Sequence, residues 1–87
     1  MALFCIDRNL GDATVEEIDA AAFRATACLP HFDGMRWLRS FYDAGARRMT
    51  CYYQASSAAD IRKHAAMSRV ACDSVTEVTE YLPDSYR

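Results

Sequence analysis

The stretch MRWLRSFYDAGARRMTCYYQA, residues 35–55, predicts the fold because it has the pattern of two strands joined by a tight turn. Met35 to Tyr42 and Arg48 to Gln54 are rich in aromatic and long apolar residues, which suit strands. Asp43 to Ala46 supplies a polar turn, in which we expect Gly45 to take a positive φ. The stretch therefore predicts an antiparallel hairpin.

A register for this hairpin follows if Asp43 pairs with Arg48. The next pairs are then Tyr42 with Met49, Ser40 with Cys51 and Leu38 with Tyr53. Because side chains alternate along a strand, the opposite face carries Trp37, Arg39, Phe41, Thr50, Tyr52 and Gln54. Three aromatic rings are unusual on a solvated face. We therefore expect one face to meet helices and the other to meet a second subunit, a ligand or both.

The segment before the hairpin predicts a strand and a helix. Residues 2–9 alternate as a short strand, which Gly11 ends. Thr14 and Glu17 have the spacing of a capping box, and apolar residues then recur at helical spacing until Pro30. The alanines of this helix are expected to let it lie close to a sheet.

The segment after the hairpin predicts a second helix and a last strand. Ser56 or Ser57 can cap a helix that runs to about Arg69. Residues 74–82 alternate as a strand ended by Pro83, and residues 84–87 are expected to form a flexible tail or an arm that contacts a partner.

The order β-α-β-β-α-β predicts an α+β ferredoxin-like fold. In this fold a four-stranded antiparallel sheet carries both helices on one face. The other face is bare in a monomer, so we expect two sheets to face each other in a dimeric α/β barrel-type assembly, a homodimer or a higher homo-oligomer.

Size and composition limit the possible functions. We expect residues 1–87 to form a single domain, whose core is marginal by itself at this length. The net charge of −2 argues against a nucleic-acid partner, and no apolar run is long enough to span a membrane. The four cysteines form no CxxC pair and no signal peptide is evident, so the sequence favours a cytoplasmic protein with reduced thiols.

Three residues form a candidate metal site. His64 lies at the inner edge of the second helix, Cys51 lies in the second hairpin strand, and Asp7 lies in the first strand. Imidazole, thiolate and carboxylate together suit nickel or another divalent transition metal. The alternative is that His64 is a buried histidine satisfied by a neighbour and that Cys51 is a core residue.

Two other kinds of site are consistent with the same residues. If the protein is an enzyme, His64 is the candidate acid or base and Cys51 the candidate nucleophile. The candidate ligand or dimer face consists of Trp37, Arg39, Phe41, Tyr52 and Gln54, where an arginine among aromatic rings can bind a carboxylate.

Several segments together resemble domain-of-unknown-function family 4242 (DUF4242). They are Asp7-Arg8, Trp37 to Phe41 with Asp43, Cys51 to Ala55, Ile61 to Ala65, and Val75 to Val78. The resemblance covers nearly the whole chain and implies a small bacterial protein with a ferredoxin-like fold, of which one branch is nickel-responsive or nickel-binding. It favours a non-catalytic metal-binding or metal-responsive protein. The alternatives are a small dimeric enzyme that acts on a hydrophobic metabolite with His64 as acid or base, and a purely structural interaction module.

Overall fold

A computed structural model describes residues 1–87. The elements follow the predicted order and are β1 (Ala2–Asn9), α1 (Val15–Cys28), β2 (Arg36–Asp43), β3 (Arg48–Ala55), α2 (Ala58–Ser68) and β4 (Ser74–Val78). Two short 3-10 helices, η1 (Leu29–His31) and η2 (Pro83–Tyr86), follow α1 and β4.

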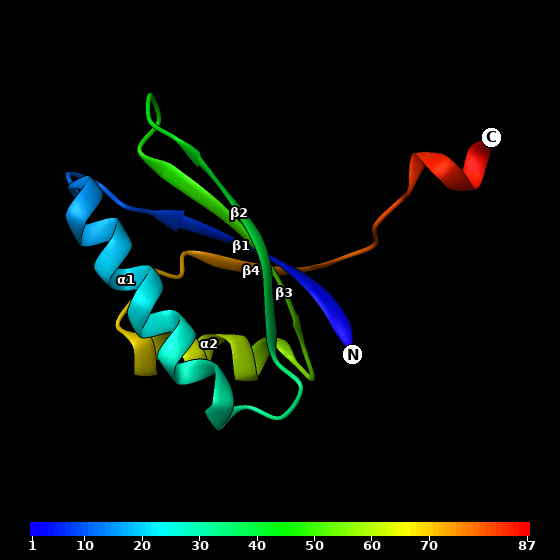
Figure 1. The fold of residues 1–87 in the computed structure, drawn as a ribbon, viewed down its shortest axis with the longest axis horizontal. Helices are drawn as coiled ribbons and strands as arrows, with labels where there is room; N and C mark the ends of the chain where they lie inside the picture. Colours follow the sequence, from blue (N-terminus) through cyan, green and yellow to red (C-terminus); the bar gives the residue numbers. More distant parts are fainter.

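The four strands form one antiparallel sheet in the order β2-β3-β1-β4. Both helices lie on the same side of this sheet and against each other (Figure 1). This arrangement confirms the predicted ferredoxin-like α+β fold. It leaves the second face of the sheet, hereafter the bare face, without any covering element of the same chain.

The hairpin register is confirmed near the turn and wrong near its open end. Asp43 pairs with Arg48 and Ser40 pairs with Cys51, but a bulge lies between Trp37 and Arg39. Trp37 therefore pairs with Tyr53, and Leu38 is the extra residue. The bulge moves Trp37 from the bare face to the helix-covered face, a correction that alternation alone could not reveal.

The turn is closed differently from the prediction. The residue with a positive φ is Arg47 rather than Gly45, at 56°. The Asp43 side chain accepts a hydrogen bond from the Ala46 N–H at 3.1 Å and so satisfies the turn.

The predicted helix starts are confirmed. The Thr14 hydroxyl accepts from the Glu17 N–H, and the Glu17 carboxylate accepts from the Thr14 N–H, which completes the capping box. Hydrogen bonds from Thr14 lower the pKa of Glu17. Ser57, the second of the two predicted candidates, caps α2 through the Asp60 N–H.

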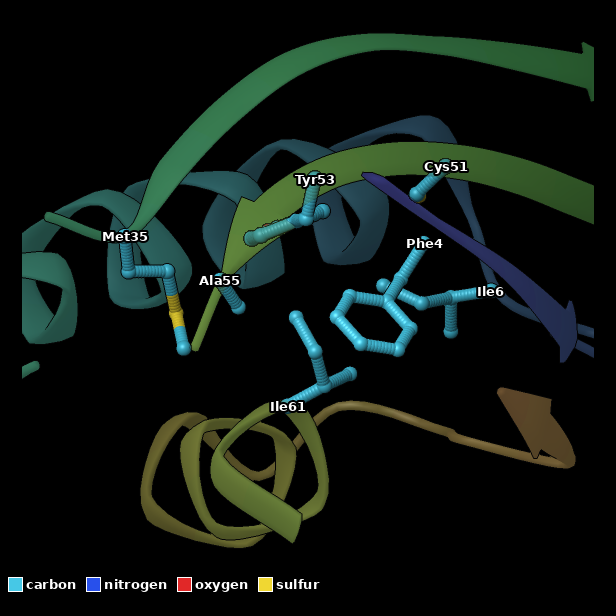
Figure 2. Close-up of a cluster of buried hydrophobic side chains, with 7 residues drawn as sticks. All are labelled: Phe4, Ile6, Met35, Cys51, Tyr53, Ala55 and Ile61. Carbon is cyan, nitrogen blue, oxygen red and sulfur yellow. The ribbon is translucent and has the colours of Figure 1, made fainter. Parts of the chain in front are cut away.

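The core lies between the sheet and α2. Figure 2 shows Ile61 of α2 pointing at Phe4 of β1, with Tyr53 and Ala55 of β3 beside them. Met35, which precedes β2, closes the cluster at one end. Every second residue of β1 and β3 thus faces α2, because successive side chains of a strand point to opposite faces of the sheet.

The last strand is shorter than predicted. It ends at Val78, which pairs with Leu3, because β1 begins at Ala2 and offers almost no further partner. Residues 79–87 instead leave the body of the molecule as an arm that ends in η2 (Figure 1). Neither α1 nor α2 has the length and hydrophobicity of a membrane-spanning helix.

Candidate functional site

His64 lies between the two helices and joins them. Its side chain is only 1% exposed, and Nε2 donates a hydrogen bond of 2.9 Å to the carbonyl oxygen of Ala25 in α1. The rings of Phe32 and Tyr53 pack against the imidazole. Burial lowers the pKa of His64, so the neutral imidazole is favoured in this position. The contacts match a structural histidine, which was the alternative to a ligand or a catalytic base.

Cys51 faces the helix-covered side of the sheet, together with Ser40 and Tyr53, with which the register grouped it. Its Sγ accepts a hydrogen bond of 2.9 Å from the Ser40 hydroxyl and one of 3.3 Å from Nε of Arg8. Trp37 Nε1 in turn donates to Ser40 Oγ at 2.8 Å. Cys51 therefore has an arginine and a serine as its polar neighbours, and its side chain forms no hydrogen bond with His64.

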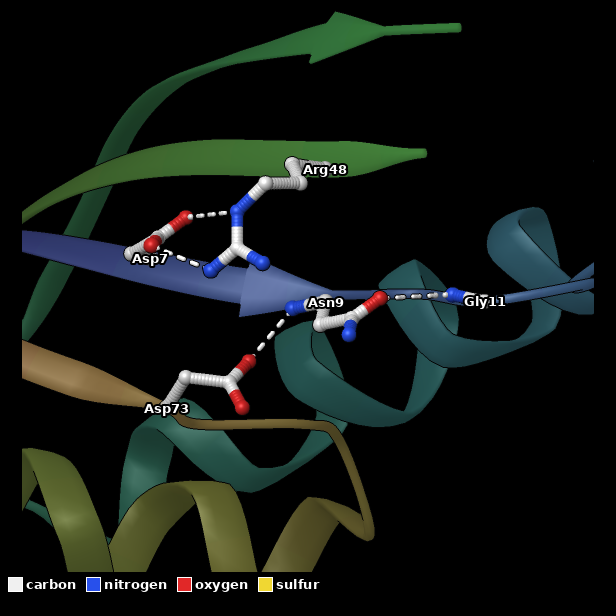
Figure 3. Close-up of polar contacts among 5 residues, drawn as sticks. All are labelled: Asp7, Asn9, Gly11, Arg48 and Asp73. Carbon is white, nitrogen blue, oxygen red and sulfur yellow. Dashed lines mark hydrogen bonds and ion pairs between the residues drawn. The ribbon is translucent and has the colours of Figure 1, made fainter. Parts of the chain in front are cut away.

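Asp7 lies on the bare face, opposite to Cys51. It pairs with Thr50 in the ladder, and both of its carboxylate oxygens accept hydrogen bonds from the Arg48 guanidinium (Figure 3). The Arg48 hydrogen bond lowers the pKa of Asp7. The predicted triad of His64, Cys51 and Asp7 is thus divided between the two faces of the sheet. Cys51 pairs with Ile6, the neighbour of Asp7 on β1, and successive side chains of a strand point to opposite faces.

Four of the five residues predicted for the ligand or dimer face do share the bare face: Arg39, Phe41, Tyr52 and Gln54. The rings of Phe41 and Tyr52 meet edge to face, with centroids 6.4 Å apart. Interaction with the neighbouring Cys5 raises the pKa of Tyr52. The fifth residue, Trp37, stacks on Tyr53 under the helices instead.

A cavity of about 450 Å³ lies on the helix-covered side, between α1 and the sheet. The sheet contributes Arg8, Trp37, Ser40, Cys51 and Tyr53 to its lining, and α1 contributes mainly small residues. The alanines of α1 therefore leave space, whereas we expected them to bring the helix close to the sheet. His64 does not line this cavity, which argues against a pocket enzyme that uses His64 as acid or base.

Sequence reasoning missed Arg8 and Ser40 as members of this site. A signal for Arg8 was present, since side chains alternate along β1 and Arg8 points to the same face as the buried Phe4 and Ile6. A basic residue among core-facing residues is unusual and often marks a site. Ser40 was placed opposite Cys51, but its bond to Trp37 depends on the bulge.

The donors of one chain do not fit a nickel centre. No group of three histidine, cysteine, aspartate or glutamate side chains lies close enough to hold a metal ion. The guanidinium of Arg8 lies against the Cys51 thiol, where it repels a cation, and Nε2 of His64 already donates to a carbonyl. Nickel sites in proteins draw on several imidazole, thiolate or carboxylate ligands.

Comparisons with known proteins agree with the fold and identify the family. The protein is similar to SCO4226 from Streptomyces coelicolor A3(2), with a TM-score of 0.80 and 16% identity over 93% of this chain and 100% of that chain. No curated protein matches the chain significantly. The family model described as "Nickel responsive protein SCO4226-like" matches residues 4–78, nearly the whole of the folded part. The chain therefore belongs to the SCO4226-like family of nickel-responsive proteins.

Proposed function

We infer that the protein is a non-catalytic, nickel-responsive cytoplasmic homodimer. The observation that carries this proposal is the family match over residues 4–78. The four free cysteines support a reducing compartment, where thiols persist. The buried position of His64 supports a role without catalysis, because no substrate can reach its ring.

The bare face supports association of two copies. Phe41 is 62% exposed there, beside Tyr52. Only 12 of the 87 residues are buried in one chain, so a second copy adds a substantial fraction to a small core. Large exposed apolar groups on a small protein commonly mark an interaction site.

The C-terminal arm supports the same partner. Tyr81, Leu82 and Tyr86 are exposed large hydrophobic residues on a segment that points away from its own body (Figure 1). A two-fold arrangement of bare faces gives each arm a surface on the other copy, since such an interface uses the same patch twice. The arm and the bare face are thus assigned to one symmetric interface.

Nickel is assigned to the assembled pair rather than to one copy. One chain lacks three clustered donors, whereas the bare face carries Cys5 and Asp7 two residues apart on one strand. Nickel binding by Asp7 requires that its carboxylate exchange the Arg48 guanidinium for the metal. Pairing through this face doubles both groups. Thiolate and carboxylate are ligand types that bind divalent metals.

Sedimentation velocity and calorimetric nickel titration of untagged, chelator-treated protein test the proposal together. Phe41→Glu places a charge in the proposed interface and is expected to give a folded monomer that no longer binds nickel. Phe23→Glu is the matched control, because Phe23 is 77% exposed on α1, away from the bare face. It should remain a dimer with wild-type nickel binding.

Each result has a defined consequence. A monomeric wild type overturns the homodimer. Equal nickel binding by wild type and by monomeric Phe41→Glu overturns the assignment of nickel to the pair. If dimeric wild type binds no nickel, direct metal binding is removed from the proposal.

A further inference from the structure

The cavity between α1 and the sheet has a charged group at its base. Arg8 is only 5% exposed and lines this cavity from β1. Its Nε donates to Cys51 Sγ, its Nη1 donates to the carbonyl oxygen of Ala71, and its guanidinium lies 5.9 Å from the centre of the Tyr53 ring. Arg8 thus connects the sheet with the segment between α2 and β4.

No carboxylate pairs with Arg8. The four ion pairs of the molecule instead involve Arg39, Arg47, Arg48 and Arg87. Buried charges in proteins are normally paired, because removing an ion from water without a counter-ion is costly. A thiol, a carbonyl and an aromatic face satisfy the Arg8 guanidinium only in part, and its positive charge has no ionic partner.

The rest of the cavity is suited to an apolar molecule. Its walls include Trp37, Met49 and Tyr53 on one side and the alanine face of α1 on the other. Burial raises the pKa of Tyr53 to about 12, so the Tyr53 side chain is a neutral phenol rather than a counter-ion for Arg8. A volume of about 450 Å³ is within the range of small-molecule sites, which combine apolar walls with a few polar groups.

The charges at the cavity edge leave Arg8 as its one buried cation. Glu17 and Asp19 line the cavity together with the less buried Arg24 and Arg69, so the edge charges balance and only Arg8 carries an unpaired buried charge. One guanidinium matches one carboxylate in geometry and charge.

We propose that the cavity binds a small apolar monocarboxylate, with its carboxylate on Arg8 and its apolar body between Trp37 and the alanine face of α1. The Ser40 hydroxyl, which donates to Cys51 Sγ, supplies a second polar contact when its proton turns from Cys51 to the carboxylate. This site is separate from the nickel function proposed above, since it lies on the other side of the sheet.

The probes are phenylacetate and its neutral analogue phenylacetamide, added to chelator-treated protein without nickel. Trp37 is the single tryptophan of the chain, so its indole N–H resonance and its fluorescence report directly on the cavity. We expect phenylacetate to shift the Trp37 resonance with a Kd on the order of 1 mM or tighter, given the size of the ligand. Phenylacetamide should bind roughly tenfold to hundredfold more weakly, which is the usual effect of losing a charge-assisted hydrogen bond.

Three variants separate the site from a general effect on the fold. Arg8→Met should abolish the preference for phenylacetate, whereas Arg62→Met removes the same charge from an exposed position of α2 and should leave binding unchanged. Ala22→Leu keeps Arg8 but narrows the cavity, so it should weaken the binding of both probes, and it serves if Arg8→Met does not fold.

Three results overturn the proposal. The first is the absence of any Trp37 shift with phenylacetate up to about ten times the expected Kd, where a single site is about 90% occupied. The second is phenylacetate binding that persists in both folded Ala22→Leu and folded Arg8→Met. The third is equal binding of phenylacetate and phenylacetamide to the wild type.

Discussion

The two helices cover the same face of the sheet but pack against it very differently. Under α2 the side chains of Ile61, His64 and Ala65 are buried, and Ile61 belongs to the core cluster. Under α1 only Ala25 is buried, and a cavity separates the helix from β2 and β3. Two halves of one βαββαβ plan thus give one packed region and one hollow region.

The difference follows from the side chains on the inner faces. α2 directs a branched aliphatic residue and an imidazole toward the strands, whereas α1 directs alanines and Ile18 toward them. Alanine cannot fill the distance between a helix axis and a sheet when other contacts hold the helix away. One such contact is the hydrogen bond from Arg24 of α1 to the Ser68 carbonyl, at 2.8 Å.

Truncating Ile61 of α2 and Ile18 of α1 to alanine should give the largest difference in the free energy of unfolding between the two halves. Ile61→Ala removes buried methyl groups from the packed region and should lower the free energy of unfolding by about 3 kcal/mol, within the usual range of roughly 2–5 kcal/mol. Ile18→Ala should cost about 1 kcal/mol or less, because Ile18 already borders open space and leaves no new closed void. Urea denaturation of both variants measures the difference, and equal losses would contradict a packed and a hollow half.

Enlarging an alanine in each half tests the same contrast in the opposite direction. Ala65→Leu overpacks the region under α2 and should lower the free energy of unfolding by about 1–3 kcal/mol. Ala22→Leu adds apolar atoms to the cavity and should raise it by roughly 0.5–1 kcal/mol. Thermal denaturation gives the sign of each effect, and destabilisation by both variants would argue that the cavity closes in solution.

The fold could be predicted from the sequence because its signals are local. The capping box at Thr14, the alternation of residues 2–9 and the pairing of Asp43 with Arg48 each depend on residues close together or on strict alternation. The bulge after Trp37 interrupts that alternation without a glycine or proline to announce it. One side chain therefore changed face, although the topology was unaffected.

The candidate site could not be predicted as well because it depends on distances between elements. The alternation of side chains grouped Cys51 with Ser40, but it could not show which face of the sheet meets the helices. It also could not show that Ala25 and Arg8 would be the partners of His64 and Cys51. The sequence also could not show that the alanines of α1 border a cavity. Contacts between the two helices set the distance from α1 to the sheet. The spacing of apolar residues within either helix does not reveal such contacts.

The pH dependence of stability should originate in the packed half. Burial lowers the pKa of His64 below its usual 6.5, so between pH 6.5 and that lower value the unfolded chain binds more protons than the folded one. Stability should therefore be fully present above pH 6.5 and decrease as the pH falls below it. Urea midpoints at pH 7, 6 and 5 measure the decrease, which His64→Gln should remove.

The second histidine of the chain provides a matched control for this decrease. His31 is exposed in η1, so His31→Gln should keep the wild-type dependence on pH. Asp7 and Glu17, whose pKa values are lowered, lose their contribution only at more acidic pH, below about 4. A decrease between pH 7 and 5 that survives His64→Gln would assign the effect to another group.

The smallest expected effect lies at Arg69, where the packed half ends and the cavity begins. Arg69 caps the C-terminus of α2 with a φ of 58°, a left-handed conformation that costs a residue with a Cβ roughly 1 kcal/mol. Arg69→Gly removes this strain but loosens the unfolded chain, so the net gain should be about 0.5 kcal/mol or less. The Arg69 carbonyl that accepts from Arg24 is retained, and the spacing of the two helices should not change. Thermal denaturation should thus give a slightly higher Tm with unchanged Trp37 fluorescence, whereas a lower Tm would mean that the Arg69 side chain itself stabilises the junction between the two halves.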